Sequence, residues 1–363
     1  MRFLMSWKRC SEKIQSKFPR SYFMLSSQAV DTAQKNVQDI LSFAIQYSEP
    51  QEALVVFDKG CDLAFALTEA YRRCLPKALF IDFESVTPEK VLEVFATLKP
   101  LDLVVLIQST SFRLDAFRIR VHLFNQSLKV IEHPHLSRLA GEEQQIYIDS
   151  LAYDASYYRG TGNALKQYID RAKIGIVDSG GEELVFDSAF EFAKLNVGDY
   201  SQMKNIGGQF PIGEVFTEAQ NLEAVSGRVR VFAFGDTSFT VNKPEKPITL
   251  VVNKGRVTDV IDSTPEFDRV LENIRADEGE VWVRELGLGL NRAFTQNRLV
   301  RDIGTYERMC GIHLSLGAKH AVYKKPDFVL SRNASKHHVD VFAITESVSF
   351  DGVSVYRNGA WTV

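Results

Sequence analysis

Short apolar segments alternate with amphipathic segments between about residues 30 and 140 of the 363-residue chain. The apolar runs are typical of strands that are buried on both faces; they are ALVVFD (53–58), KALFIDF (77–83), LDLVVLI (101–107) and LKVIEH (128–133). The segments around them have apolar residues at helical spacing, at residues 31–49, 61–74, 88–98 and 116–126. Strands that alternate with helices predict an open α/β domain with a mostly parallel sheet.

The pattern changes after a helical segment at residues 160–173, and strands and turns dominate the remainder. Residues 173–187 predict a hairpin with the pair Gly180–Gly181 at its turn. One helix, at residues 264–276, interrupts the strand-rich pattern. The length of the chain also favours two domains. We therefore expect an α/β domain at residues 1–159, followed by a β-rich α+β domain at residues 160–363.

Charge balance, cysteine usage and missing motifs exclude several classes of protein. The 43 basic and 46 acidic side chains give a net charge of −3 without a basic stripe, so no nucleic-acid partner is expected. Four cysteines without CxxC spacing indicate the reduced thiols of a cytoplasmic protein. The first 28 residues lack the apolar segment of a signal peptide, and no stretch approaches about 20 apolar residues, so no membrane contact is expected. Both common phosphate-binding glycine motifs are missing.

Charged residues interrupt the strand-rich half at four places that are suited to chemistry. In 338-HVD-340, strand periodicity puts His338 and Asp340 side by side on one face of a predicted strand. The other three places are PIGEVF, VWVRELGLG and HLSLGAKH, which contain the candidate residues Glu214, Glu285, His313 and His320. In the second of these, Gly287 and Gly289 would allow another group to approach the backbone closely.

Each candidate also has an ordinary structural explanation. Glu214 could be an exposed turn carboxylate, Glu285 could belong to a surface ion pair with Arg284, and His313 could be a hydrogen-bonded core histidine. As a set, two glutamates, imidazoles and a His-x-Asp offer the ligands that suit zinc, manganese, cobalt or iron. We therefore expect a metal-binding domain in the strand-rich half, where two glutamates, one or two histidines and the His338–Asp340 pair would offer enough ligands for a two-metal centre.

These segments resemble motifs of the aminopeptidase T-type (thermophilic) metallopeptidases, which include leucyl aminopeptidase-like proteins. PIGEVFTEA is similar to the family's P-x-x-E-V-F-T-A-P segment, and RELGLGLNRA is similar to its E-L/V-x-x-G-T-N-P-like segment. HLSLGAKH is similar to an H-x-x-L-G-x-A-Y segment, and HVD matches the family's terminal H-x-D. Their order and approximate spacing hold over residues 160–345, and the α/β half fits the family's N-terminal domain in outline.

The resemblance implies a metal-dependent hydrolase that acts on the N-terminus of a peptide through a cocatalytic divalent-metal site. It assigns metal binding to Glu214, Glu285 and His313 and to the His-x-Asp pair, and it gives Glu214 or Glu285 a catalytic role in moving a proton. His320 stands where the family has a tyrosine, so we expect a catalytic His320 that alters pH dependence or substrate choice. A homodimer is also implied.

Two other functions remain open. In length the chain is closer to the 2,5-dihydroxypyridine dioxygenase-like sister group, which surrounds a single non-haem Fe(II) and cleaves the ring of a small molecule. His313, His338 and Asp340 could supply the two-histidine, one-carboxylate triad of such a centre. A chain without turnover would instead be a peptide-binding member of a biosynthetic pathway. The two glutamates favour the peptidase-type site, because a one-iron centre does not need them.

Overall fold

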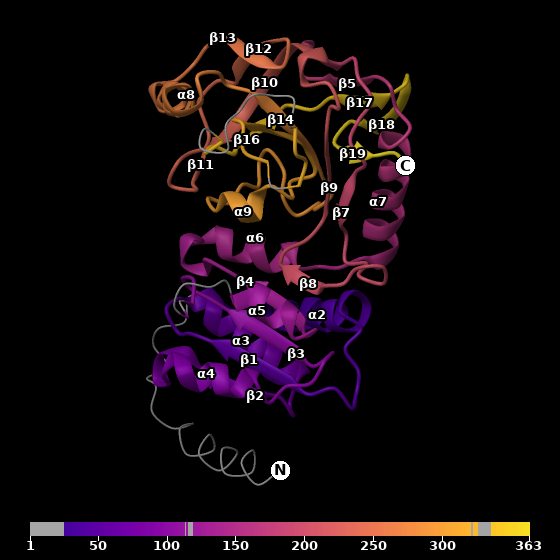
Figure 1. The fold of residues 1–363 in the computed structure, drawn as a ribbon. Coiled ribbons are helices and arrows are strands. Elements are labelled where there is room, and N and C mark those ends of the chain that lie inside the picture. Colours follow the sequence, from indigo (N-terminus) through magenta and orange to yellow (C-terminus); the bar gives the residue numbers. More distant parts are fainter. Residues whose placement is uncertain (1–24, 113, 115–118, 321, 326–334) are drawn as a thin grey trace. The chain divides into compact units, whose positions relative to one another are not determined.

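The computed structural model describes residues 25–112, 114, 119–320, 322–325 and 335–363 (Figure 1). Most of the first 28 residues, and part of the helix predicted at residues 116–126, lie outside the described residues. The chain forms two compact units, one of residues 1–140 and 200–210 and the other of residues 141–199 and 211–363. The predicted division between residues 159 and 160 falls inside a helix, α7 (Ala155–Ile169), which begins at Ala155 because the Asp154 side chain caps it.

The first unit contains a parallel sheet with the strand order β2-β1-β3-β4-β8. Its strands are β1 (Ala53–Phe57), β2 (Leu79–Asp82), β3 (Leu103–Ile107), β4 (Lys129–His133) and β8 (Ile206–Gln209). Its helices are α2 (Ser27–Asp39), η1 (Ile40–Ala44), α3 (Asp62–Cys74), η2 (Phe83–Ser85), α4 (Pro88–Phe95), α5 (Ile119–Asn125) and η3 (Leu136–Arg138). The α/β pattern of strands and helices predicted for residues 30–140 is therefore confirmed.

Helices cover both faces of this parallel sheet. On one face, Val56 of β1, Val104 of β3 and Val130 of β4 share a core with Phe95 of α4 and Leu123 of α5. On the other face, α3 contacts β1 and β3, and α2 packs against α3. Every residue of β1 and β3 is buried, which explains why these strands are apolar on both sides.

The edge strand β8 reaches the parallel sheet from a distant part of the chain. It pairs with β4 in register from Lys129↔Ile206 to Glu132↔Gln209. Gly207 has a φ of +96°, and a Cβ at this position would lie 1.9 Å from the carbonyl oxygen of Val130. Only glycine allows this approach, and the sequence IGGQ therefore gives no strand signal.

A buried histidine couples the stability of the first unit to pH. His133 ends β4 and is fully buried, with its Nε2 atom 2.8 Å from the Tyr71 hydroxyl oxygen. Burial lowers the pKa of His133 to about 3, because the charged imidazolium would lose its hydration. The folded protein therefore keeps His133 neutral at pH values where the unfolded chain, with a pKa of about 6.5, takes up a proton.

We predict that a His133→Gln variant loses part of the acid sensitivity of folding. Neutral His133 stabilises the wild type above about pH 6.5, and this contribution falls by up to about 1.4 kcal/mol per pH unit as the pH drops toward 3. Urea unfolding between pH 7 and pH 4.5 measures the slope. Equal slopes for the wild type and His133→Gln would contradict the prediction.

The second unit is built around a large, curled antiparallel sheet (Figure 1). Its main path is β19-β18-β17-β5-β6-β10-β16-β15-β14-β9-β7, and β10 pairs in addition with β11 and with β12, which pairs with β13. The strands are β5 (Gly175–Asp178), β6 (Glu183–Phe186), β7 (Lys194–Asn196), β9 (Glu214–Glu218), β10 (Val225–Gly235), β11 (Val241–Asn242), β12 (Ile248–Asn253), β13 (Arg256–Ile261), β14 (Val283–Gly289), β15 (Gly311–Leu316), β16 (Val339–Ala343), β17 (Ser347–Phe350), β18 (Val353–Arg357) and β19 (Ala360–Trp361).

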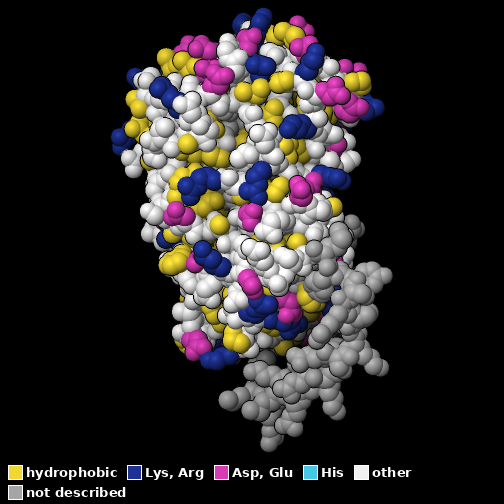
Figure 2. Space-filling model, turned by 180° about the vertical axis from the view of Figure 1, so that it is seen from behind, with side chains coloured by type: hydrophobic (Ala, Val, Ile, Leu, Met, Phe, Trp, Pro, Cys, Tyr) yellow, Lys and Arg dark blue, Asp and Glu magenta, His cyan; other side chains and the backbone are white. Residues whose placement is uncertain are grey.

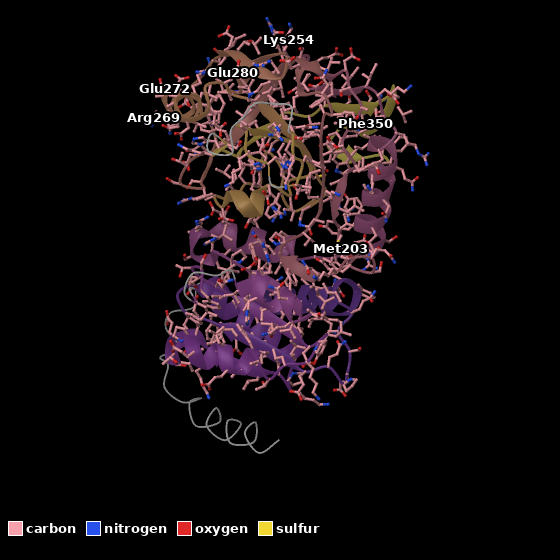
Figure 3. All side chains as sticks on the ribbon, in the orientation of Figure 1. Met203, Lys254, Arg269, Glu272, Glu280 and Phe350 are labelled. Atoms are coloured by element: carbon pink, nitrogen blue, oxygen red, sulfur yellow. The ribbon has the colours of Figure 1, made fainter. Side chains whose placement is uncertain are left out.

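Helices of the second unit are short apart from α7 and α8. They are α6 (Glu142–Ser150), α7, η4 (Leu222–Ala224), α8 (Pro265–Glu278) and α9 (Ile303–Tyr306). Thr264 caps α8, Pro265 occupies its first turn, and Gly279 ends it with a φ of +82°. The exposed residues Arg269 and Glu272 lie on the outer side of α8 (Figure 3).

The β-rich character that the sequence predicts for the second half is confirmed. The predicted hairpin is β5–β6, and both turn glycines have positive φ values, as a tight hairpin turn requires. The predicted helix at 264–276 is α8. On the face shown in Figure 2, basic and acidic side chains are interspersed, so neither sign of charge dominates it. None of the helices in the described part of the chain has an apolar stretch that would reach across a bilayer.

Candidate metal centre

Four adjacent strands of the second unit, in the order β16-β15-β14-β9, carry Asp340, His313, Glu285 and Glu214, while His320 follows β15 and His338 precedes β16. Directly paired residues of antiparallel strands point to the same face, as do residues two apart on one strand. Glu214 of β9 is paired with Gly289 of β14, and His313 of β15 is paired with Gly287. Glu285, Gly287 and Gly289 alternate along β14, so Glu285, Glu214 and His313 share one face.

Gly287 provides the space in which the His313 ring lies. A Cβ on Gly287 would be 2.1 Å from the ring atoms Cε1 and Nε2 of His313, far inside van der Waals contact. The imidazole therefore lies across β14 and reaches toward the carboxylates of Glu214 and Glu285. The close approach predicted for this glycine is present, and the approaching group is His313.

Glu214, Glu285 and His313 form a buried group that we call the Glu–His cluster. The His313 Nε2 atom is 3.3 Å from Oε1 of Glu214 and 3.5 Å from Oε1 of Glu285. One potential ligand atom from each residue lies within 4.8 Å of the others, a spacing that suits three ligands of one cation. Within the described residues, neither ring nitrogen of His313 has a hydrogen-bond partner, although the ring is buried. A cation bound between the carboxylates would give the Nε2 atom of His313 a partner, so these residues fit a divalent metal.

The charges in the Glu–His cluster are strongly coupled. Burial alone would raise the pKa of Glu285, but the facing imidazoles of His313 and His320 outweigh burial and hold this pKa well below its usual range. Burial likewise disfavours a charged His313, but Glu214 and Glu285 raise the His313 pKa to about 10. In the metal-free protein, the positive charge of imidazolium thus balances the negative charge of the carboxylates. A bound cation would take over this role.

Asp340 and His338 lie beside the Glu–His cluster and form a pair of their own. Asp340 is on β16, and the His338 Nε2 atom is 3.2 Å from its Oδ1 atom. Burial lowers the His338 pKa, but Asp340 outweighs burial and raises it to about 9. Among the described residues, only the ligand atoms of the Glu–His cluster all lie within 4.8 Å of one another, and this pair is not part of that set. The negative charge of Asp340 nevertheless acts on His313, and the charge of His338 acts on Glu285, so both sites share one electrostatic environment.

His320 faces Glu285 with a ring whose orientation is fixed by the backbone. The Nδ1 atom accepts hydrogen bonds from the backbone N–H groups of Val322 at 3.2 Å and Tyr323 at 3.3 Å. A neutral ring that accepts at Nδ1 carries its proton on Nε2. This Nε2 atom lies 2.8 Å from Oε2 of Glu285. His320 therefore lies in close contact with a cluster carboxylate, although within the described residues its Nε2 atom makes no hydrogen bond of regular geometry.

Arg284 and Glu218 form a buried ion pair that the sequence did not indicate. The ordinary explanation of Glu285, a surface ion pair with its neighbour Arg284, is therefore wrong. The Nε and Nη2 atoms of Arg284 donate to the two carboxylate oxygens of Glu218 at 2.7 and 3.1 Å, with side-chain exposures of 4% and 0%. Arg284 also donates to the carbonyl oxygens of Ala318 and Tyr323, on either side of His320. The spacing of Glu214 and Glu218 predicts two carboxylates on one strand face, but it does not identify Arg284 as the partner of either.

A second buried arginine lies near Glu214. Arg308 is 7% exposed, and its Nη2 atom lies 3.9 Å from Oε2 of Glu214. Its Nη1 atom donates to the carbonyl oxygen of Gly304. The Glu214 carboxylate thus has an imidazole on one side and a guanidinium on the other.

The comparisons with known proteins support the fold that the resemblance implied. No protein-family model matches the sequence, and neither does any curated protein. The structure is similar to that of wild-type AmpT from Thermus thermophilus, with a TM-score of 0.55 and 14% identity over 92% of this chain and 99% of that chain. The chain therefore shares the fold of AmpT. The relationship to the dioxygenase-like sister group stays a prediction.

We predict that Gly287→Ala displaces His313 and weakens metal binding. The new methyl group and the ring cannot occupy the same space, while the backbone of β14 tolerates alanine because Gly287 has no positive φ. We expect an affinity for Zn²⁺ that is lower by about tenfold or more, measured by competition with a chelating indicator. Gly160→Ala on α7 is the matched control, because a Cβ there meets nothing within 4 Å. Equal affinities for the two variants would contradict this role of Gly287.

Proposed function

We propose that this chain is a metal-dependent, aminopeptidase-like hydrolase that acts on the N-terminus of a peptide. The observation that carries the proposal is the Glu–His cluster, a buried set of two carboxylates and one imidazole with ligand atoms within 4.8 Å of one another. The fold shared with AmpT supports the same conclusion. Carboxylate and imidazole ligands fit zinc, manganese or cobalt.

Five residues would hold the cations in this proposal. Glu214, Glu285 and His313 would bind the first cation, and Asp340 with His338 would add ligands for a second. Divalent cations in such a centre supply a water of lowered pKa and polarise the scissile carbonyl. The centre lies on one face of a sheet, where the strand backbone fixes the ligand positions before substrate binds.

The side chains around the cations would recognise the substrate and move its protons. A free α-amino group at the end of the substrate could serve as a further ligand in this centre, which favours the N-terminus of a peptide. Glu214 or Glu285 would carry a proton to the leaving amine, since both are within reach of the same space. His320 would hold Glu285 in position through its protonated Nε2 atom.

We predict that the purified protein contains two zinc, manganese or cobalt ions per chain and releases p-nitroaniline from amino-acid p-nitroanilides. Metal analysis with an assay before and after chelation measures both properties. His313→Gln should abolish the activity and reduce metal content, whereas His135→Gln in the first unit should preserve both. One iron per chain together with O2 uptake in the presence of hydroxypyridines would instead indicate the dioxygenase. A chain that binds no metal would contradict both enzymes and favour the peptide-binding protein.

We predict different effects for two substitutions of His320. The side-chain oxygen of Asn can accept the hydrogen bonds that the backbone N–H groups donate to His320 Nδ1, but the Asn side chain is too short to reach Glu285. The amide N–H group of Gln reaches about as far as Nε2 of His320 does. His320→Asn should weaken metal binding by about tenfold, and His320→Gln should weaken it less, because the donor to Glu285 survives. Isothermal titration with Zn²⁺ compares the variants; equal affinities would show that Glu285 does not depend on His320.

A further inference from the structure

The C-terminal end of α8 carries a glutamate where the helix should be apolar. Its buried residues follow helical spacing, and the last position of the buried stripe is Glu278; the members are Phe267, Val270, Leu271, Ile274 and Glu278. A carboxylate at such a position is costly to bury unless hydrogen-bond donors surround it. Glu278 is 8% exposed, so its partners decide whether it is tolerated.

The partners of Glu278 are backbone N–H groups from two separate segments. Oε2 accepts from the N–H of Ala318 at 2.7 Å. Oε1 accepts from the N–H groups of Lys336 and His337, both at 2.7 Å. One carboxylate therefore joins residues 317–320, which follow β15, to residues 336–338, which precede β16. We call these segments the first and second legs.

The two legs also bond to each other next to Glu278. The N–H of Lys319 donates to the carbonyl oxygen of His337 at 3.0 Å, and Nδ1 of His338 lies 3.1 Å from the carbonyl oxygen of Lys319. Gly317 has a φ of +104°, and a Cβ on it would lie 2.5 Å from the carbonyl oxygen of His337. Close pairing of the legs thus depends on Glu278 at one point and on Gly317 at another.

Each leg carries one histidine of the candidate metal centre. His320 follows the pairing point of the first leg and faces Glu285, and His338 ends the second leg and faces Asp340. The two imidazole ring centres are 6.0 Å apart. The separation of the legs therefore sets the separation of the two rings.

We propose that Glu278 is a positioning residue of the metal centre, which holds His320 and His338 in place through the backbones of the two legs. The inference rests on the proposed two-metal function and names a residue that contacts neither the ligands nor the substrate. Glu214, Glu285 and His313 lie on β9, β14 and β15, whose pairing does not involve Glu278. Arg284 holds the first leg independently of Glu278, through the carbonyl oxygens of Ala318 and Tyr323. The loss of Glu278 should therefore displace mainly the second leg, and weaken the His338–Asp340 side of the centre more than the Glu–His cluster.

Titration of the metal-free full-length protein with Co²⁺, followed by visible absorption, tests the proposal. Glu278→Gln keeps the size of the side chain but turns an amide NH2 group toward one of the legs. We expect this variant to bind its first Co²⁺ within about twofold of wild type and its second at least about tenfold more weakly. Gly317→Ala should give the same selective loss, because it separates the legs without altering the carboxylate.

Asp277→Asn is the matched control. Asp277 precedes Glu278 and is exposed, and it pairs with the side chains of Lys336 and His337 rather than with their backbone. Exposed pairs of this kind contribute little, so this variant should bind both Co²⁺ ions as wild type does. The proposal is overturned if Glu278→Gln weakens both ions equally or neither, or if Asp277→Asn reproduces its effect.

A second measurement separates failure of this inference from failure of the proposed function. A wild type that binds only one Co²⁺ contradicts the two-metal function, whatever Glu278 does. NMR of the histidine imidazole groups in the metal-free protein then tests the role of Glu278. If Glu278→Gln changes the signals of His320 and His338 but leaves the His133 signal unchanged, its role is supported. Unchanged signals of His320 and His338 in Glu278→Gln overturn it. If that variant does not fold, Gly317→Ala provides the same two comparisons.

Discussion

The register of β9, β14 and β15 is the constraint on which the candidate site depends. Side chains alternate between sheet faces, so a shift of one residue in β14 would turn Glu285 away from Glu214 and His313. The same shift would replace Gly287 beneath the His313 ring by a leucine on either side. Correct pairing therefore creates the ligand set and the space for it in a single step.

Charges beneath and beside this sheet face are compensated before any cation or substrate binds. The Glu218–Arg284 pair is buried and bidentate, and Arg284 also bonds to the backbone around His320. Removing one member of such a pair leaves a buried charge without compensation, which costs about 3–5 kcal/mol. The segment that carries His320 is thus fixed by the interior of the protein, and its side chain needs little rearrangement to hold Glu285.

The sequence predicted those features that are encoded by local periodicity or by residue type. The alternation of buried strands and helices identified the parallel sheet, and the Gly180–Gly181 pair identified the β5–β6 hairpin. Glu214, Glu285 and His313 were recognisable because each is a polar residue in an apolar or glycine-rich context. Their mutual distances could not be predicted, because these depend on the pairing of strands that are far apart in the chain.

Other features could not be predicted from the sequence, because they depend on partners in distant segments of the chain. Glu278 looks like an ordinary helix-terminal carboxylate, and only the N–H groups of Ala318, Lys336 and His337 explain its burial. Arg284 had only its sequence neighbour Glu285 as a candidate partner. In the structure, the β14–β15 pairing has a bulge between Val283 and Leu286, and Arg284 donates to Glu218. In both cases the partner is at least 40 residues away.

The strand β8 has a consequence for how this protein can be divided. Because residues 206–209 complete the sheet at the edge of β4, the polypeptide leaves the first unit after residue 140, returns for a few residues and departs again. A fragment that stops at residue 140 would leave the hydrogen-bonding groups at the edge of β4 unpaired, and exposed strand edges of this kind promote aggregation. The sheet of the first unit is therefore complete only after residues 206–209 have been synthesised, when residues 141–199 of the second unit have already been made by the ribosome.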